Sequence, residues 1–260
     1  MTINSIAQNQ FSPAMQRLAS GNRINSAADD AAGLAIMENM TAQIRGLDQG
    51  TANTMDMQNL VSTADGAMDT INDSLNRIRE LSVQAANGTL TPANREMIQE
   101  EIGQLSRHIE STVGTAQFNT MNLLDGSVQD ANTASSPDGT GAIVNINDMS
   151  SLAQAITSFN VADNDFDINE VDSLISQVSS QRAELGALEN RFDHTVNANT
   201  ITSLNMADSR SRINDADMAA EMAALNADRV INEMQILMQQ QQQQQMEQEG
   251  QTVLATAGIR

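Results

Sequence analysis

Residues 61–86 read VSTADGAMDTINDSLNRIRELSVQAA, and this stretch carries the clearest helical pattern of the chain. Its apolar side chains recur at alternating spacings of three and four residues: Val61, Ala64, Met68, Ile71, Leu75 and Ile78. An average spacing of about 3.5 residues is typical of a seam between paired helices. We therefore predict a long helix here that packs lengthwise against other helices.

The same pattern continues toward the N-terminus, so the predicted helix covers residues 27–86 and is about 90 Å long at about 1.5 Å per residue. Ser26 and Asp29 form a variant of the capping box before it. Gly46 and Gly50 are poor helix formers, and a break or kink is expected at 46–50. Five earlier positions share the seam: Gly33, Met37, Met40, Ile44 and Leu47.

A second helix is predicted after a short turn. Asn87-Gly88 is a turn sequence, and Thr91-Pro92 supplies an N-cap followed by a first-turn proline. Residues 92–116 then keep helical spacing at Ile98, Ile102, Leu105, Ile109 and Val113. Two long helices joined by a short turn indicate an antiparallel hairpin.

The middle of the chain, residues 125–168, is rich in turn sequences such as Asp125-Gly126. One short strand is expected at 142–146 and one short helix at 151–159. Helical spacing resumes at Val171, and a later helix includes seven consecutive Gln at 239–245. The predicted fold class is all-α: long antiparallel helices in a coiled-coil bundle, with a small irregular outer segment that has room for a short β-hairpin.

The composition excludes several classes of function. Thirteen Arg and no Lys face 33 acidic residues, and the net charge of -20 argues against binding to nucleic acid or to an anionic membrane surface. There is no Cys, Trp or Tyr, and 16 Met help to fill the core instead, which suits thin helix–helix seams. The first residues show no secretory signal, and no run of about 18 apolar residues predicts a membrane helix.

The sequence predicts no catalytic or metal site and no cofactor. Residues 163–170 read DNDFDINE, but no register places Gly sixth and Glu twelfth, as a calcium loop requires. The only two His, His108 and His194, are isolated and are interpreted as exposed helix-surface residues. Arg77 beside Glu80 is, from its spacing alone, an ion pair on a solvated helix face. We therefore predict that the protein is not an enzyme.

Five stretches, in this order, resemble the terminal signatures of one family, bacterial flagellin. They are QRLASGNRINSAADDAAGLAI at 16–36, LNRIRELSVQAANG at 75–88, QFN and LLDG within 117–126, SQRAELGALENRF at 180–192 and SRINDAD at 211–217. The resemblance implies a structural subunit that polymerises with copies of itself into the flagellar filament. It also implies export through the flagellar channel and an extracellular location in the filament.

The resemblance implies a division of the chain into three parts. Residues 1–30 and 218–260 are expected to form inner-tube helices, 31–126 and 169–217 a rod-like helical domain, and 127–168 a short outward-facing segment. The expected partners are other copies of the subunit, an export chaperone and the export apparatus, and the cap and hook-junction proteins. A further expected partner is the Toll-like receptor for flagellin, at the matching positions Arg77, Leu81 and Glu101.

The terminal segments are expected to pack mainly on neighbouring copies, because short lone helices are marginal in water. Residues 1–24 and 220–260 are therefore predicted to be disordered in the free subunit. The candidate residues for packing between subunits are Leu18, Ile24, Ile213, Val230, Met234 and Leu237.

Three alternatives compete with the filament subunit. A hook–filament junction protein of the same superfamily shares the helical ends but assembles in few copies. A cytosolic coiled-coil scaffold or signalling protein would share the helical pattern without being exported. A flagellin with an inserted metallopeptidase is excluded, because residues 127–168 contain no His.

Overall fold

The computed structural model describes residues 13–162 and 166–256, with side chains up to residue 250, and forms two compact units. One unit is residues 42–205, and the other joins residues 1–41 with 206–260. The helices are α2 (Pro13–Ser20), α3 (Ala31–Ala85), α4 (Pro92–Thr115), α5 (Ser150–Ser158), α6 (Ile168–Asn214) and α7 (Met218–Thr256). The strands are β1 (Gln117–Phe118), β2 (Met121–Asn122), β3 (Ala131–Ala134) and β4 (Gly141–Val144). The predicted all-α fold class is confirmed.

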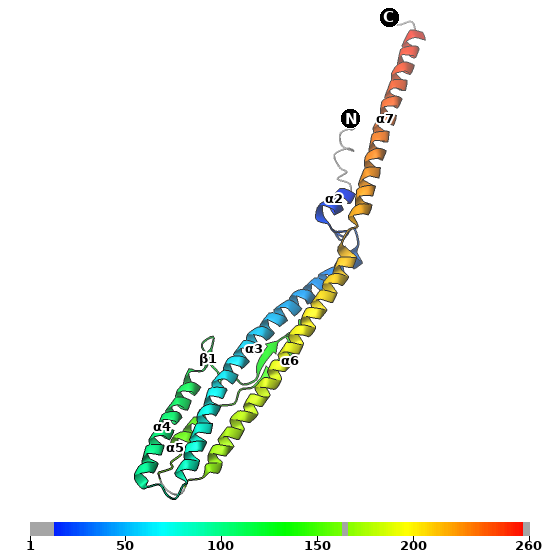
Figure 1. Cartoon of the computed structure of the whole chain (residues 1–260). Helices are drawn as coiled ribbons and strands as arrows, with labels where there is room; N and C mark the ends of the chain where they lie inside the picture. The colour runs from blue at the N-terminus through cyan, green and yellow to red at the C-terminus, as the bar shows by residue number, and fades with distance from the viewer. Residues whose placement is uncertain (1–12, 163–165, 257–260) are drawn as a thin grey trace. The chain divides into compact units, whose positions relative to one another are not determined.

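In the unit 42–205, the helices α3, α4 and α6 run side by side, and α5 lies against α4 (Figure 1). The predicted antiparallel hairpin of α3 and α4 is confirmed. Thr91 caps α4, since its hydroxyl accepts a 3.3 Å hydrogen bond from the Asn94 amide, and Pro92 occupies the first turn. The buried Arg95 donates a 3.0 Å hydrogen bond to the Ala85 carbonyl at the end of α3. These contacts fix the turn between the two helices.

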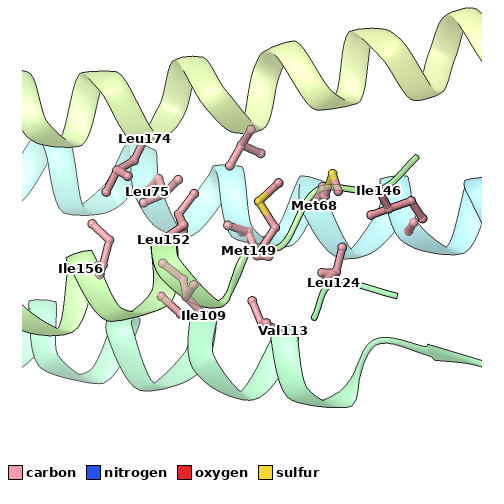
Figure 2. Close-up of a cluster of buried hydrophobic side chains, with 14 of the residues drawn as sticks. Met68, Leu75, Ile109, Val113, Leu124, Ile146, Met149, Leu152, Ile156 and Leu174 are labelled. Carbon is pink, nitrogen blue, oxygen red and sulfur yellow. The ribbon is translucent and has the colours of Figure 1, made fainter. Parts of the chain in front are cut away.

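The predicted seam of α3 forms the centre of the core (Figure 2). All six of its apolar side chains from Val61 to Ile78 are fully buried. Leu152 and Ile156 of α5 point into the same cluster from the opposite side. Facing positions on α4 and α6 belong to the same cluster: Ile98, Ile102, Ile109, Val113, Val171, Leu174, Val178, Leu185 and Phe192. Leu124, Ile146 and Met149, from the segments between the helices, also belong to it.

Ion pairs connect α3 with α6 at the edge of this core. The Arg182 guanidinium lies 2.9 Å from Asp65 and 2.6 Å from Asp69, which are four residues apart on α3. Arg79 pairs with Asp172. All of these side chains are still partly exposed to solvent, and such ion pairs contribute little to stability. Their main effect is therefore to fix the lengthwise register of the two helices.

Helix α3 is continuous through residues 46–50, so the expected break there is wrong. The two glycines instead allow the loop after β3 to lie directly on the helix. A Cβ atom at Gly46 would be 2.7 Å from the Cβ of Pro137, and one at Gly50 would be 2.2 Å from the Ser135 carbonyl oxygen. The glycines therefore serve close approach between segments, not flexibility.

The outer segment contains more strand than the sequence indicated. The strand expected at 142–146 is β4. It pairs antiparallel with β3, which had no strand assignment, and the pair forms the short β-hairpin for which the outer segment was expected to have room. The short helix expected at 151–159 is confirmed as α5. A second small hairpin, β1 with β2, lies just before the outer segment and was not predicted. Asn119 and Thr120 close it, at φ 47° and 66°.

Replacing Thr120 with Gly is expected to stabilise the subunit by about 1 kcal/mol, because a β-branched residue is strained at positive φ and Gly is not. The free energy of unfolding in urea measures this. Thr120→Ala keeps a Cβ atom and should recover clearly less of the gain. Equal gains for both variants would show that the hydroxyl, not the backbone angle, is responsible.

In the second unit, α3 begins at Ala31, four residues later than predicted, because Asp29 holds a turn before it. The Asp29 carboxylate accepts hydrogen bonds from the amides of Asn25 and Ser26, at 3.1 and 2.9 Å, and from the Ser26 hydroxyl. These bonds, led by that from Asn25, lower the pKa of Asp29. The cap is Asp30, whose carboxylate accepts a 2.8 Å hydrogen bond from the Gly33 amide.

Candidate self-association surface

One side of α7 carries exposed small and apolar residues at helical spacing. We call it the uncharged stripe, and it consists of Ala220, Ala223, Ala227, Val230, Met234, Leu237 and Met238. All seven are exposed. At 3.6 residues per turn they share one face. The five charged residues between 218 and 248 fall outside that face: Glu221, Asp228, Arg229, Glu233 and Glu247.

Helix α2 packs against the first part of α7 (Figure 1). Arg17 of α2 lies 3.2 Å from the Glu221 carboxylate. The half-buried residues of this part of α7 are Glu221, Leu225 and Asp228, which share a different face from the stripe. The Asp217 carboxylate caps α7 by accepting 3.0 and 3.2 Å hydrogen bonds from the amides of Ala219 and Ala220. Helix α2 therefore leaves the uncharged stripe exposed to solvent.

Beyond the region of α2, α7 has no cover among its described side chains: every residue from 229 to 250 is exposed. This stretch includes the seven Gln, which the structure confirms as helical. Residues 13–20, which form α2, and residues 220–256 are helical where disorder was predicted for the free subunit. Residues 1–12 and 257–260 lie outside the described part. The helix is therefore formed, but none of the described residues of its unit covers the stripe.

The six candidate packing residues separate into three groups by exposure. Val230, Met234 and Leu237 are 59, 58 and 56% exposed. Ile24 is only 3% exposed, because its side chain packs beside Gly33 inside the unit, so it cannot be a contact between subunits in this conformation. Leu18 and Ile213 are half-buried.

A short connection holds the N-terminal segment to the link between α6 and α7. The Arg23 amide donates to the Asn214 carbonyl at 2.5 Å, and the Ala216 amide donates to the Gly21 carbonyl at 3.0 Å. The Arg23 guanidinium donates two further bonds, of 3.1 and 2.7 Å, to the Ile213 carbonyl. These hydrogen bonds between residues 21–23 and 213–216 were not predicted from the sequence. No periodic pattern indicates backbone pairing between segments so far apart in the chain. Met238 was also missed, although it lies four residues after Met234.

The candidate receptor residues are brought together only in part. Arg77 donates 3.0 and 2.8 Å hydrogen bonds to Glu101 and a 3.0 Å bond to Glu80. These bonds, first those to Glu101, raise the pKa of Arg77, so it stays charged. Arg77 and Glu101 are about half exposed. Leu81 is 2% exposed and belongs to the core, so its assignment as a surface contact is wrong for this conformation.

Among the residues that the structure describes, no group of three or more His, Cys, Asp or Glu is arranged to hold a metal ion. The segment read as a failed calcium loop lies partly outside them, at 163–165. His108 and His194 are exposed on helices, as predicted. No helix within the described ranges has the length and apolar character needed to span a bilayer.

Two family models match this chain. The bacterial flagellin N-terminal helical region matches residues 1–129, and the bacterial flagellin C-terminal helical region matches residues 168–254. Residues 130–167, which include β3, β4 and α5, lie outside both matches.

Several flagellins are similar in sequence. That of Halalkalibacterium halodurans is 38% identical over 232 residues, which cover 86% of this chain and 85% of that protein. The flagellin of Bacillus subtilis is 36% identical, with 89% and 90% covered. A flagellin of Clostridium tyrobutyricum is 48% identical over 127 residues, but they span only 33% of its length.

Two solved structures are similar in fold. Bacillus cereus flagellin aligns with a TM-score of 0.50 and 29% identity, covering 57% of this chain and 88% of that one. A Vibrio parahaemolyticus protein assigned as flagellar hook-associated aligns with a TM-score of 0.57, covering 72% of this chain and all of that one. Its identity is 17%, so the second likeness is one of fold alone.

Proposed function

Because this chain belongs to the bacterial flagellin family and is a structural subunit of the flagellar filament, we propose that residues 1–30 and 218–260 join its copies. The observation that carries the proposal is the uncharged stripe, which is exposed along α7 and is not covered by α2. In the polymer it lies against α7 or the N-terminal segment of neighbouring subunits. The exposed Val230, Met234 and Leu237 are its largest side chains, together with Met238.

Both the absence of charge on the stripe and the burial of its apolar side chains favour this surface for self-association. Copies with a net charge of -20 repel one another, so their contact must avoid like charges. The stripe does so, because its seven side chains carry no charge. Burying a side chain such as Val, Leu or Met contributes about 1.5–3 kcal/mol. The small Ala residues near the start of the stripe let another helix approach closely.

The remaining parts of the subunit take the roles that the resemblance implies. Residues 31–126 and 169–217 form a rod around the inner tube, and 127–168 face outward. The subunit leaves the cell through the export apparatus, escorted by an export chaperone, and meets the cap and hook-junction proteins in an extracellular filament. The hook–filament junction alternative is not favoured, because the relatives that align over most of the chain are flagellins.

Electron microscopy of the purified full chain tests the function directly. At high protein concentration and neutral pH, the subunit is expected to form long helical filaments that grow from short seeds. Closed rings or short oligomers of fixed size would instead indicate a junction-type protein, because only contacts that do not close give an open polymer.

The Toll-like receptor for flagellin is a second proposed partner, through Arg77 and Glu101. Replacing Arg77 with Ala is expected to weaken receptor binding about tenfold or more, since a charged hydrogen bond contributes about 1.5–3 kcal/mol. Surface plasmon resonance with the receptor ectodomain measures the affinity. Arg79→Ala is a matched control, because Arg79 is as exposed on α3 as Arg77 but pairs with Asp172 of α6 and not with Glu101. An unchanged affinity for Arg77→Ala rejects the assignment.

A further inference from the structure

Four of the five exposed methionines in the described part of α7 lie on different sides of the helix, and the fifth, Met218, is its first residue. Met234 and Met238 belong to the uncharged stripe and are 58% and 60% exposed. Met222 and Met246, 53% and 64% exposed, lie on the sides that carry the charged residues. An oxidant in solution therefore reaches all four sulfur atoms in the free subunit, although only the first two belong to the proposed contact.

We propose that the thioethers of Met234 and Met238 are a modification site for hydroperoxides, and that their oxidation blocks assembly of the subunit. This inference rests on the proposed function of the stripe. In the reaction the sulfur atom attacks one peroxide oxygen, an S–O bond forms, and the O–O bond breaks. The thioether loses two electrons to become a sulfoxide, and hydrogen peroxide is reduced and leaves as water.

The oxidised stripe can no longer form a dry contact. A sulfoxide is polar and accepts hydrogen bonds, whereas the thioether it replaces is apolar. None of the other five side chains of the stripe, which are Ala, Val and Leu, can donate a hydrogen bond. Association would thus bury the sulfoxide oxygen without a partner from the stripe itself, which is unfavourable. Met222 and Met246 remain in contact with water or charged neighbours, where a polar oxygen is tolerated.

The test compares assembly before and after treatment of the free subunit with hydrogen peroxide. Peptide mapping by mass spectrometry counts the sulfoxide at each methionine, and sedimentation gives the critical concentration for polymerisation. We expect oxidation to raise the critical concentration of the wild-type chain at least about tenfold, as disruption of a Met-rich contact implies. The double variant Met234→Leu/Met238→Leu should resist the treatment, whereas Met222→Leu/Met246→Leu should remain as sensitive as the wild type.

Each outcome decides between specific claims. Equal sensitivity of the wild type and of Met234→Leu/Met238→Leu overturns the inference, as does full assembly of the oxidised wild type. Failure of the untreated wild type to polymerise counts against the proposed function instead. Should the leucine variant assemble poorly by itself, wild-type filaments supply a second measurement. Their Met234 and Met238 should oxidise at least about tenfold more slowly than in the free subunit, and unchanged rates overturn the inference.

Discussion

Replacing Met234 with Glu is expected to abolish polymerisation of the purified subunit. The residue lies in the middle of the uncharged stripe, where a carboxylate would be buried on association without a partner. An uncompensated buried charge is unfavourable by about 3–5 kcal/mol, and the filament repeats the contact at every subunit. Sedimentation and electron microscopy at a protein concentration where the wild type assembles fully measure the loss.

Met222→Glu is the matched control, because Met222 is equally exposed on the same helix but lies on the side of Arg229 and Glu233. Filaments should persist in this variant. Removal of residues 226–260 is a coarser form of the same experiment and should also eliminate filaments, while residues 42–205 keep their fold. Equal loss in both glutamate variants would mean that the whole circumference of α7, not the stripe, joins the subunits.

Replacing Gly50 with Ala is expected to lower the free energy of unfolding by about 2–3 kcal/mol, as overpacking of a close contact does. The added Cβ atom would lie 2.2 Å from the Ser135 carbonyl oxygen. That oxygen belongs to backbone which β3, β4 and the Asn199 side chain hold in place, so it cannot simply rotate away. Urea unfolding followed by circular dichroism measures the effect.

Replacing Gly66 with Ala on the same helix is expected to have the opposite effect and to raise the free energy of unfolding. Gly66 is exposed on α3, and a Cβ atom there would meet nothing within 4 Å. Alanine favours the helix over glycine by about 0.8–1 kcal/mol, so this variant should be more stable than the wild type. If both glycines responded alike, helix propensity alone would explain them, and the contact between α3 and the loop at Ser135 would have no energetic weight.

Helix α3 shows which features could be predicted from the sequence and which could not. Apolar periodicity identified the seam of α3 and the buried face of α4, because one helix face repeats every three or four residues. It gave no information on Gly50, since a close approach between α3 and residue 135 depends on tertiary packing. From the sequence alone, a glycine within a helix is equally consistent with a weak point and with a contact.

The candidate surfaces were predictable to different degrees. Val230, Met234 and Leu237 followed from spacing in a region with no second apolar face to cover them, and they are exposed. Ile24 and Leu81 were also apolar and lay in motif positions, but other parts of their own unit bury them. Periodicity indicates which side chains avoid water, and only the fold tells whether the cover comes from the same chain. Strand β3 could not be predicted, because its sequence, ANTA, is short and its apolar and polar residues do not alternate.

Amide hydrogen exchange, compared between the dilute subunit and the filament, tests most directly whether α7 finds its partners in other copies. We predict that amides in 229–250 exchange much faster than those of residues 61–85 when the subunit is alone, because a helix without packed cover opens easily. In the filament they should become as protected as those of residues 61–85. Strong protection of 229–250 in the dilute subunit, unchanged on assembly, would contradict it.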